Sequence, residues 1–263
     1  MGDETSAGRR PVALVTGASS GIGAALAAVI AADGYDLVLV ARRAEALAAL
    51  AARLPTNAET FALDLREPDA GEVLQEEMAT RGIDVDLLVN NAGYGMVGPF
   101  ATLDRLDQIG IIDLNVRTLT DLTHRFVGPM RERRSGGIIN VASTAAFQPG
   151  PLMAVYYATK AYVLSFSEAI AEELRSDGVR VTAICPGPTA SEFQARANME
   201  GTRMIASMPV MTSEEVARIG WRYFRKGKPV VVTGISNKIT AATVPFVPRP
   251  VLLKAVKALQ SRR

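Results

Sequence analysis

The chain has 263 residues, of which 48% are hydrophobic and 21% charged, a composition typical of globular proteins. Its net charge of +2 provides little non-specific attraction to nucleic acid, and no recognition motif is present, so we expect no nucleic-acid partner. The single cysteine, Cys185, excludes an internal disulfide, and residues 1–10 lack the apolar stretch of a secretory signal. A reducing, cytoplasmic location fits these features best, with residues 1–10 as a disordered polar N-terminus.

Short apolar runs alternate with helical patterns between residues 11 and 235. We expect strands at residues 12–16, 37–41, 60–63, 87–90, 137–142, 179–185 and 229–233. We expect helices to begin near Gly21, Arg43, Asp69, Leu103, Met153 and Ser213. The alternation is typical of βαβ units, and strands that are apolar on both faces predict helices on both sides of the sheet. The sequence therefore predicts an α/β fold: one doubly wound, Rossmann-like domain over residues 11–235 with a parallel sheet of about seven strands, followed by a basic tail over residues 236–263.

The first apolar run leads into a glycine-rich turn that opens an Ala-rich helical pattern. Glycines allow a sharp turn and a close approach of the backbone to a pyrophosphate, and the N–H groups at the start of a helix attract phosphate. The turn therefore predicts a dinucleotide site. Its expected contacts are Gly17, Ser19, Ser20, Gly21, Ile22 and Gly23.

The end of the second strand indicates which dinucleotide binds. A carboxylate there would hold the ribose 2′-hydroxyl of NAD, but the residues are Arg42 and Arg43. Guanidinium groups suit the 2′-phosphate of NADP, so we expect NADP(H), held chiefly by Arg42. Instead of binding the phosphate, Arg43 could lie on the first turn of the next helix with its side chain in solvent. After the third strand, Asp64 and the adjacent Leu65 are candidates to meet the adenine, although Asp64 suits a helix cap equally well.

Tyr156 and Lys160 lie four residues apart in an apparently helical segment and should share one face of it. An ammonium group at this spacing is expected to lower the pKa of the phenol from about 10 toward the range useful for general acid–base catalysis. Ser143 ends a strand thirteen residues earlier, at the edge where parallel α/β sheets bind ligands. There it can donate a hydrogen bond to a substrate carbonyl, or cap a turn.

Further residues are predicted at the same edge. Asn115 lies in a helical run in which Asn is a poor helix former. The others follow the fourth and sixth strands: Asn91, Ala92, Gly93, Pro186, Gly187 and Thr189.

In this order and spacing the motifs resemble those of the short-chain dehydrogenase/reductase family, including its glycine pattern Gly-x-x-x-Gly-x-Gly. The resemblance covers about residues 10–235. It implies that Tyr156 exchanges a proton with the substrate oxygen, that Lys160 lowers the pKa of Tyr156 and binds the nicotinamide ribose, that Ser143 polarises the carbonyl and that Asn115 holds a water behind Lys160. Residues 91–93 would line the adenosine-ribose side of the cofactor, and Pro186, Gly187 and Thr189 the nicotinamide side.

The function implied is hydride transfer between NADP(H) and a carbonyl or secondary alcohol, with no metal. The alternative is a non-catalytic NADP(H) sensor on the same fold, but such a protein would be expected to have lost Tyr156, Lys160 or Ser143. Members of the family are commonly dimers or tetramers, so we expect a homo-oligomer.

Residues 190–211 are expected to form a flexible apolar flap over the site, although a Met-rich core helix explains them as well. The flap contains Phe193, Met199, Met204, Met208 and Met211. With Tyr94, Phe147 and Met153 in the wall, the substrate would be a sizeable apolar ketone or alcohol.

The tail is markedly basic, because no acidic residue follows Glu215 whereas eleven Lys or Arg residues do. Over residues 251–259, the residues Val251, Leu252, Ala255, Val256 and Leu259 share one helical face, with Lys254 and Lys257 off it. Such a helix suits either a membrane surface, through residues 245–263, or packing against the body or a second subunit. We favour packing.

Overall fold

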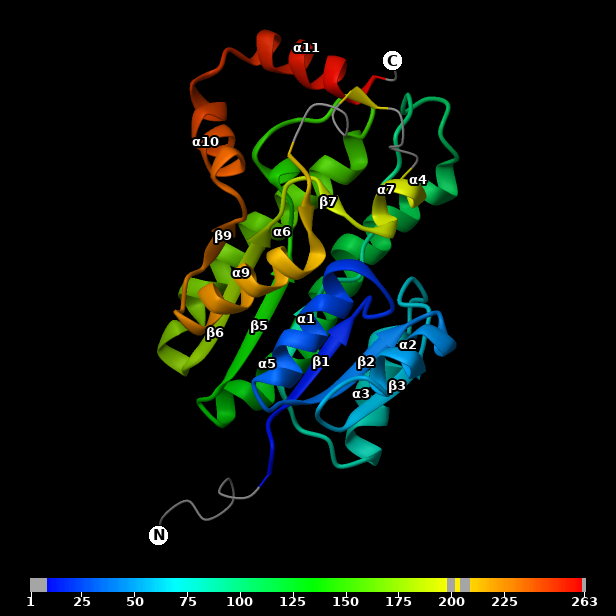
Figure 1. Cartoon of the computed structure of the whole chain (residues 1–263), viewed down its shortest axis with the longest axis vertical. Coiled ribbons are helices and arrows are strands. Elements are labelled where there is room, and N and C mark those ends of the chain that lie inside the picture. The colour runs from blue at the N-terminus through cyan, green and yellow to red at the C-terminus, as the bar shows by residue number, and fades with distance from the viewer. Residues whose placement is uncertain (1–8, 198–201, 204–208, 262–263) are drawn as a thin grey trace.

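The computed structural model describes residues 9–197, 202–203 and 209–261. It contains a seven-stranded sheet of order β3-β2-β1-β4-β5-β6-β9, in which all neighbours are parallel (Figure 1). The strands are β1 (Val12–Thr16), β2 (Asp36–Ala41), β3 (Ala58–Ala62), β4 (Val85–Asn90), β5 (Gly136–Val141), β6 (Val179–Cys185) and β9 (Val230–Val232). Each predicted strand is confirmed within two residues.

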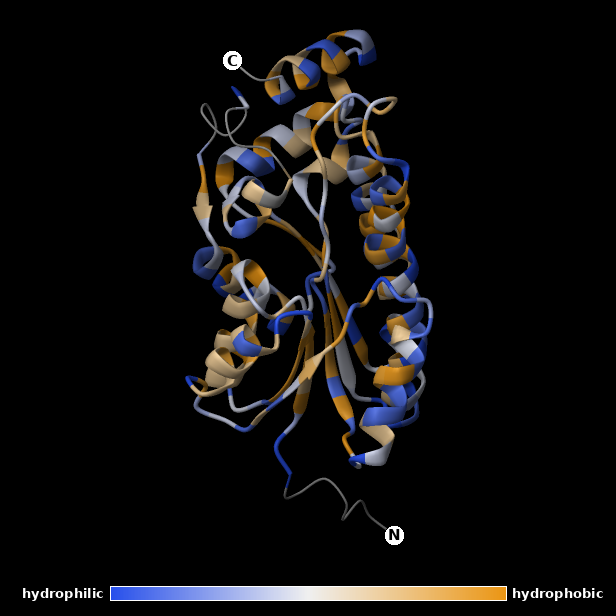
Figure 2. Ribbon diagram, turned by 90° about the vertical axis from the view of Figure 1, so that its right-hand side faces the viewer, coloured by the Kyte–Doolittle hydropathy of each residue, from blue (hydrophilic) through white to orange (hydrophobic). Residues whose placement is uncertain are grey.

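The sheet is covered by a helical layer on each face (Figure 2). In β1, Ala13 and Val15 belong to one buried cluster and Leu14 to the other, because successive strand side chains point to opposite faces. The first cluster packs against α1 (Gly21–Ala32), α2 (Ala44–Ala51) and α9 (Ser213–Arg225). The second packs against α3 (Ala70–Thr80), α5 (Leu119–Glu132) and α6 (Ala154–Glu173). This is the doubly wound α/β architecture that the sequence predicts.

The predicted helix starts are also confirmed within two residues. Five of them belong to α1, α2, α3, α6 and α9, and the sixth belongs to α4 (Arg105–Ile112). Asn115 lies where the helix widens into the π-helical turn η1 (Asp113–Thr118), which joins α4 to α5. Such turns are frequent at functional sites. Short single turns complete this part: η2 (Thr144–Phe147), η3 (Arg175–Asp177) and α7 (Glu192–Arg196).

Two features were not predicted from the sequence. One is a two-residue strand pair, β7 (Thr189–Ala190) with β8 (Met211–Thr212), which is too short to leave a pattern. The other is α10 (Ile235–Thr243), whose β-branched residues are weak helix formers. Of the expected flap methionines, Met211 lies in β8, while Met199, Met204 and Met208 lie outside the described residues.

The tail continues from α10 through η4 (Val244–Phe246) to α11 (Arg249–Gln260), at the end of the molecule opposite the N-terminus (Figure 1). Leu252 and Val256 of α11 are buried against Met153 and Tyr157 of the body. The tail helix therefore packs on the body, the alternative that the sequence favours. Among the described residues, no helix is both long and apolar enough to span a bilayer.

Candidate active site

A cavity of about 770 Å³ opens at the carboxyl ends of the strands. Of the sequence-predicted site residues, all except Gly23 and Asn115 line it. They are Gly17, Ser19, Ser20, Gly21, Ile22, Arg42, Arg43, Asp64, Leu65, Asn91, Ala92, Gly93, Ser143, Tyr156, Lys160, Pro186, Gly187 and Thr189. The fold thus brings the candidate cofactor and catalytic residues to one space, and their roles remain predictions.

The glycine-rich turn between β1 and α1 has the shape that a dinucleotide needs. Gly17 and Gly21 have φ values of +64° and +58°, in the left-handed region that favours glycine. A Cβ on Gly17 would lie 2.7 Å from Asn91 Nδ2, and one on Gly23 would overlap the Gly17 carbonyl oxygen. Only glycine fits at Gly17 and Gly23, so the turn packs closely at the start of α1. Gly17 and Gly21 line the cavity, and the residues present fit a bound pyrophosphate.

Thr16 and Asn91 fix this turn to the neighbouring strand. The Thr16 hydroxyl donates to Val89 O at 3.1 Å and accepts from the N–H groups of Asn91 and Ala92 at 2.9 and 3.0 Å. Asn91 Nδ2 donates to Thr16 O at 2.9 Å and to Gly17 O at 3.2 Å. Asn91 thus braces the turn as well as lining the cavity. Thr16 was not predicted as a site residue because it reads as the end of a strand.

Arg42 and Arg43 differ in their surroundings. Arg42 is exposed at the cavity margin. Arg43 is held across the cleft, with Nη2 2.9 Å from Glu192 Oε2 on α7 and 3.2 Å from Ser19 Oγ. Glu192 also accepts a hydrogen bond from Ser20 Oγ at 3.2 Å. The Glu192 carboxylate therefore lies among donors that suit a phosphate, a feature with no signal in the sequence.

Asp64 is engaged by its near neighbour Arg66. The guanidinium donates to Asp64 Oδ2 at 2.7 Å, and the Arg66 N–H donates to Oδ1 at 3.1 Å. These hydrogen bonds hold the pKa of the Asp64 carboxyl below its usual value. Asp64 therefore closes a local turn and does not cap α3, which begins after Asp69, while its contact with the adenine stays a prediction.

Tyr156 lies in the first turn of α6 and borders the cavity. Burial raises the pKa of its phenol, and the nearby Ser143 side chain acts in the opposite direction. Lys160 lies on the same helix face, with Nζ 5.9 Å from the centre of the Tyr156 ring. The phenol and the two partners predicted for it are therefore neighbours.

The pKa of the Tyr156 phenol does not fall as the sequence predicts. Lys160 Nζ donates to Val141 O at 2.7 Å, and burial lowers its own pKa to about 8. Burial disfavours the charged form of both groups, so the pKa of Tyr156 rises where the sequence predicted a fall.

Asn115 stands behind Lys160 without lining the cavity. Its Oδ1 accepts from Tyr94 N at 3.1 Å, and its Nδ2 donates to Tyr94 O and Thr159 Oγ1, each at 3.0 Å. Gly93 lies between them, because a Cβ there would be 2.9 Å from Asn115 Oδ1 and 3.5 Å from Lys160 Nζ. In this structure Asn115 fixes the strand end on which Gly93 lies.

The loop after β6 forms the opposite wall. Pro186 O accepts from Thr144 N at 2.8 Å, while Ser143 Oγ accepts from Ala145 N at 3.1 Å and so also caps η2. Asn237 of α10 is 3% exposed, packs against Gly187 and donates to Thr233 O at 2.7 Å. Sequence reasoning missed Asn237 because it missed α10.

The part of the cavity beside the tail is lined mainly by apolar residues. Tyr94, Phe147 and Met153 line it as predicted, and the Phe193 ring lies 5.3 Å from that of Tyr156. The tail adds residues that were not predicted as site residues: Val244, Val247, Leu252, Val256 and Leu259. Within the described ranges no group of three or more His, Cys, Asp or Glu side chains is arranged to hold a metal ion.

Known proteins are similar to this chain in sequence and in fold. A family model described as short chain dehydrogenase matches residues 11–201. Serine 3-dehydrogenase of Agrobacterium fabrum is 36% identical over 181 residues, which are 68% of this chain and 72% of that protein.

Two solved structures are also similar. A short-chain dehydrogenase from Sphingobium yanoikuyae in complex with NADPH has a TM-score of 0.80 at 31% identity, over 90% of this chain and 93% of the other. A bulky-bulky ketone specific alcohol dehydrogenase from Comamonas testosteroni has a TM-score of 0.74 at 28% identity, over 90% and 93%. Since the family match spans the strands and the turn that build the site, the chain belongs to the short-chain dehydrogenase family of NAD(P)-linked oxidoreductases.

Proposed function

We propose that this protein transfers a hydride between NADP(H) and a sizeable apolar ketone or secondary alcohol, with Tyr156 as general acid and base. The observation that carries the proposal is that Tyr156, Ser143 and Lys160 line one cavity together with the glycine-rich turn, with Lys160 on the same helix face as Tyr156. A sensor that performs no catalysis would not need Tyr156, Ser143 and Lys160 together.

The residues divide the chemistry among them. The nicotinamide supplies the hydride in reduction and accepts it in oxidation. In reduction the Tyr156 hydroxyl gives its proton to the substrate oxygen, and the Ser143 hydroxyl stabilises that oxygen with a hydrogen bond. The Lys160 ammonium stabilises the phenolate that remains. In oxidation the proton passes from the substrate hydroxyl back to the Tyr156 phenolate.

NADP(H) is proposed over NAD(H) because Arg42 and Arg43 stand at the end of β2, where a carboxylate would select NAD. The similar Sphingobium enzyme in complex with NADPH supports this choice. An apolar substrate is proposed from the wall made by Phe147, Met153 and the tail, and from the likeness to an enzyme specific for bulky ketones. We also propose that residues 11–235 act as the catalytic domain, in the cytoplasm and in a homo-oligomer.

The test is the substitution Tyr156→Phe, with NADPH consumption measured against ketones graded by size. We expect turnover to fall by about a thousandfold or more, because the acid that contributes this factor is gone, while NADPH binding by fluorescence is unchanged. Tyr162→Phe, on the same helix but at the surface, is the control and should turn over normally. Retained turnover in Tyr156→Phe would contradict the assigned acid.

A further inference from the structure

The unit formed by α10 and η4 is apolar on two opposite sides. Its inner side carries Ala241 and Val244, which line the cavity. On its outer side Ile235, Ile239 and Phe246 are 78%, 60% and 86% exposed. Spacings of four and seven residues put these three on one helical stripe. An exposed stripe of large apolar side chains marks an interaction surface.

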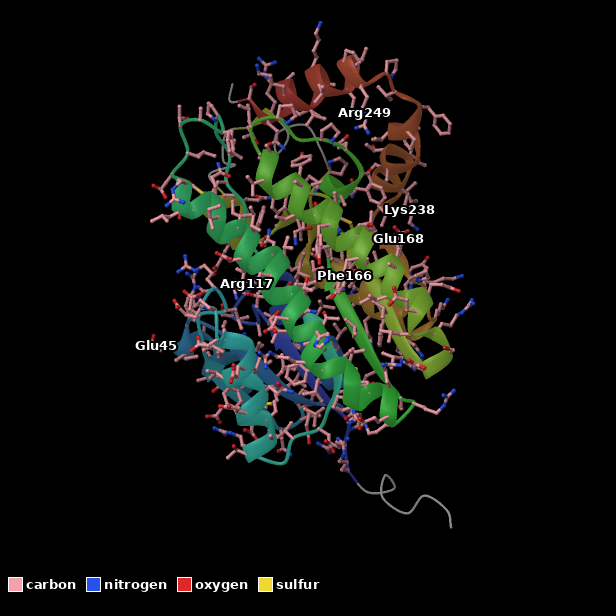
Figure 3. The ribbon with its side chains drawn as sticks, turned by 180° about the vertical axis from the view of Figure 1, so that it is seen from behind. Glu45, Arg117, Phe166, Glu168, Lys238 and Arg249 are labelled. Atoms are coloured by element: carbon pink, nitrogen blue, oxygen red, sulfur yellow. The ribbon has the colours of Figure 1, made fainter. Side chains whose placement is uncertain are left out.

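The adjoining helix α11 adds positive charge to the same end of the molecule. Its inner side, with Leu252 and Val256, is buried against the body. Lys254 and Lys257 are exposed on this helix. Arg249 is exposed at its start (Figure 3). No acidic residue occurs anywhere after Glu215. The outward surface of the tail therefore combines apolar side chains with cations and supplies no carboxylate of its own.

We propose that this surface docks on an anionic lipid bilayer. The tail surface is defined by Ile235, Ile239, Phe246, Arg249, Lys254 and Lys257. Phospholipid headgroups offer phosphates to the cations, and the boundary with the acyl chains accepts the apolar stripe. A second copy on this surface would bring like charges together, and nucleic acid would leave the apolar stripe without a partner.

Docking would place the helices that close the cavity beside the lipid. The reason is that α10, η4 and α11 carry cavity-side residues on their inner sides and the tail surface on their outer sides. Its value for catalysis rests on the proposed function, since an apolar ketone dissolved in the bilayer would meet the side of the cavity closed by Val244 and Leu252. Docking itself is independent of turnover and is measured without it.

The experiment is co-sedimentation of the full-length protein with vesicles of equal parts phosphatidylglycerol and phosphatidylcholine, against vesicles of phosphatidylcholine alone. We expect binding to the anionic vesicles that weakens in high salt. Lys254→Gln with Lys257→Gln should lower the partition coefficient about tenfold or more, since each cation near such a surface contributes roughly fivefold. Ile239→Ser with Phe246→Ser should lower it at least as much.

The matched control is Val73→Ser, because this apolar residue is 39% exposed on α3, at the end of the molecule opposite the tail (Figure 1). The control variant should bind vesicles as the unchanged protein does, and circular dichroism should show that every variant is folded. The proposal fails if the unchanged protein never sediments with anionic vesicles, or if the control variant weakens binding as much as the tail variants do. It also fails if the tail variants change only the oligomeric state in analytical ultracentrifugation, because a second copy would then cover the surface.

Discussion

At the scale of single residues, burial decides the acid–base properties of the site. Tyr156 and Lys160 are close in space, yet each loses water around it, and the charged form of each is disfavoured. The carbonyl of Val141 takes a hydrogen bond from Lys160 and so keeps the ammonium oriented. Burying the charged Lys160 ammonium lowers the stability of the folded chain, and this loss can be measured.

The pH dependence of unfolding should reveal that cost. The pKa of Lys160 is about 8 in the folded chain against 10.5 in the unfolded chain. Between these values the unfolded chain holds more protons, so this residue makes stability rise with pH. We expect the free energy of unfolding of the native protein, relative to Lys160→Met, to increase by about 3 kcal/mol from pH 8 to 10.5.

The native protein must be compared with Lys160→Met because other titrating groups make stability fall as the pH rises. Burial raises the pKa of the Cys185 thiol to about 12, so its contribution to stability falls as alkali ionises the unfolded chain. Both proteins share Cys185 and Tyr157, and their effects cancel in the difference. A difference that stays constant in urea titrations across this range would show that Lys160 is not desolvated.

The cofactor preference also belongs to single residues. In Arg42→Asp we expect the ratio of kcat/KM for NADPH to that for NADH to fall at least about tenfold, because a charge-assisted hydrogen bond to the 2′-phosphate is lost. Glu192→Gln should shift the ratio upward, since its carboxylate pairs with Arg43 among donors suited to a phosphate. Arg53→Asp, at the far end of α2, is the control. An unchanged ratio in Arg42→Asp would mean that other groups hold the phosphate.

At the scale of elements, one buried hydrogen bond connects the tail helix to the catalytic helix. Gln260 Nε2 of α11 donates to Tyr157 Oη of α6 at 2.7 Å, and the two residues are 1% and 5% exposed. Tyr157 directly follows Tyr156 in sequence, and their rings meet edge to face at 6.1 Å. The position of α11 over the cavity is thus coupled to the helix that carries the acid.

Removing the hydrogen bond between Gln260 and Tyr157 should destabilise the docking of α11 more than it slows the chemical step. In Gln260→Leu the phenol of Tyr157 loses its buried partner, which costs about 1–3 kcal/mol. We expect faster hydrogen exchange over residues 249–260 and a higher KM for bulky ketones, with kcat for a small ketone nearly unchanged. Ala258→Leu, at an exposed position on the same helix, should leave both values as they are. Equal losses for small and bulky ketones would show a general defect.

At the scale of the whole molecule, the side seen in Figure 3 is the candidate subunit interface. There α5 and α6 lie side by side, and no described element covers them. Ile109 and Ile112 of α4 are 45% and 41% exposed. This side lies apart from the tail, so assembly and docking need not compete.

We predict that assembly uses this side. Ile109→Glu with Ile112→Glu places two carboxylates in the contact, and we expect the oligomer to dissociate to monomers in analytical ultracentrifugation. Val73→Glu is the control, because this apolar residue of α3 is exposed to a similar degree, at 39%. A double variant that keeps the native sedimentation coefficient would place the interface elsewhere.

The sequence by itself determined the succession of strands and helices along the chain and the gathering of the candidate site, because apolar runs in βαβ order fix where the ends of parallel strands meet. It could not give the direction of the Tyr156 pKa, the pairing of Arg43 with Glu192, or Asn237 and Gln260 as neighbours of the site. Each of these depends on residues far apart in the chain and on how much water remains between them. Only the tertiary structure decided that the tail closes the cavity, because the apolar stripe of α11 fits several partners until the body offers Met153 and Tyr157.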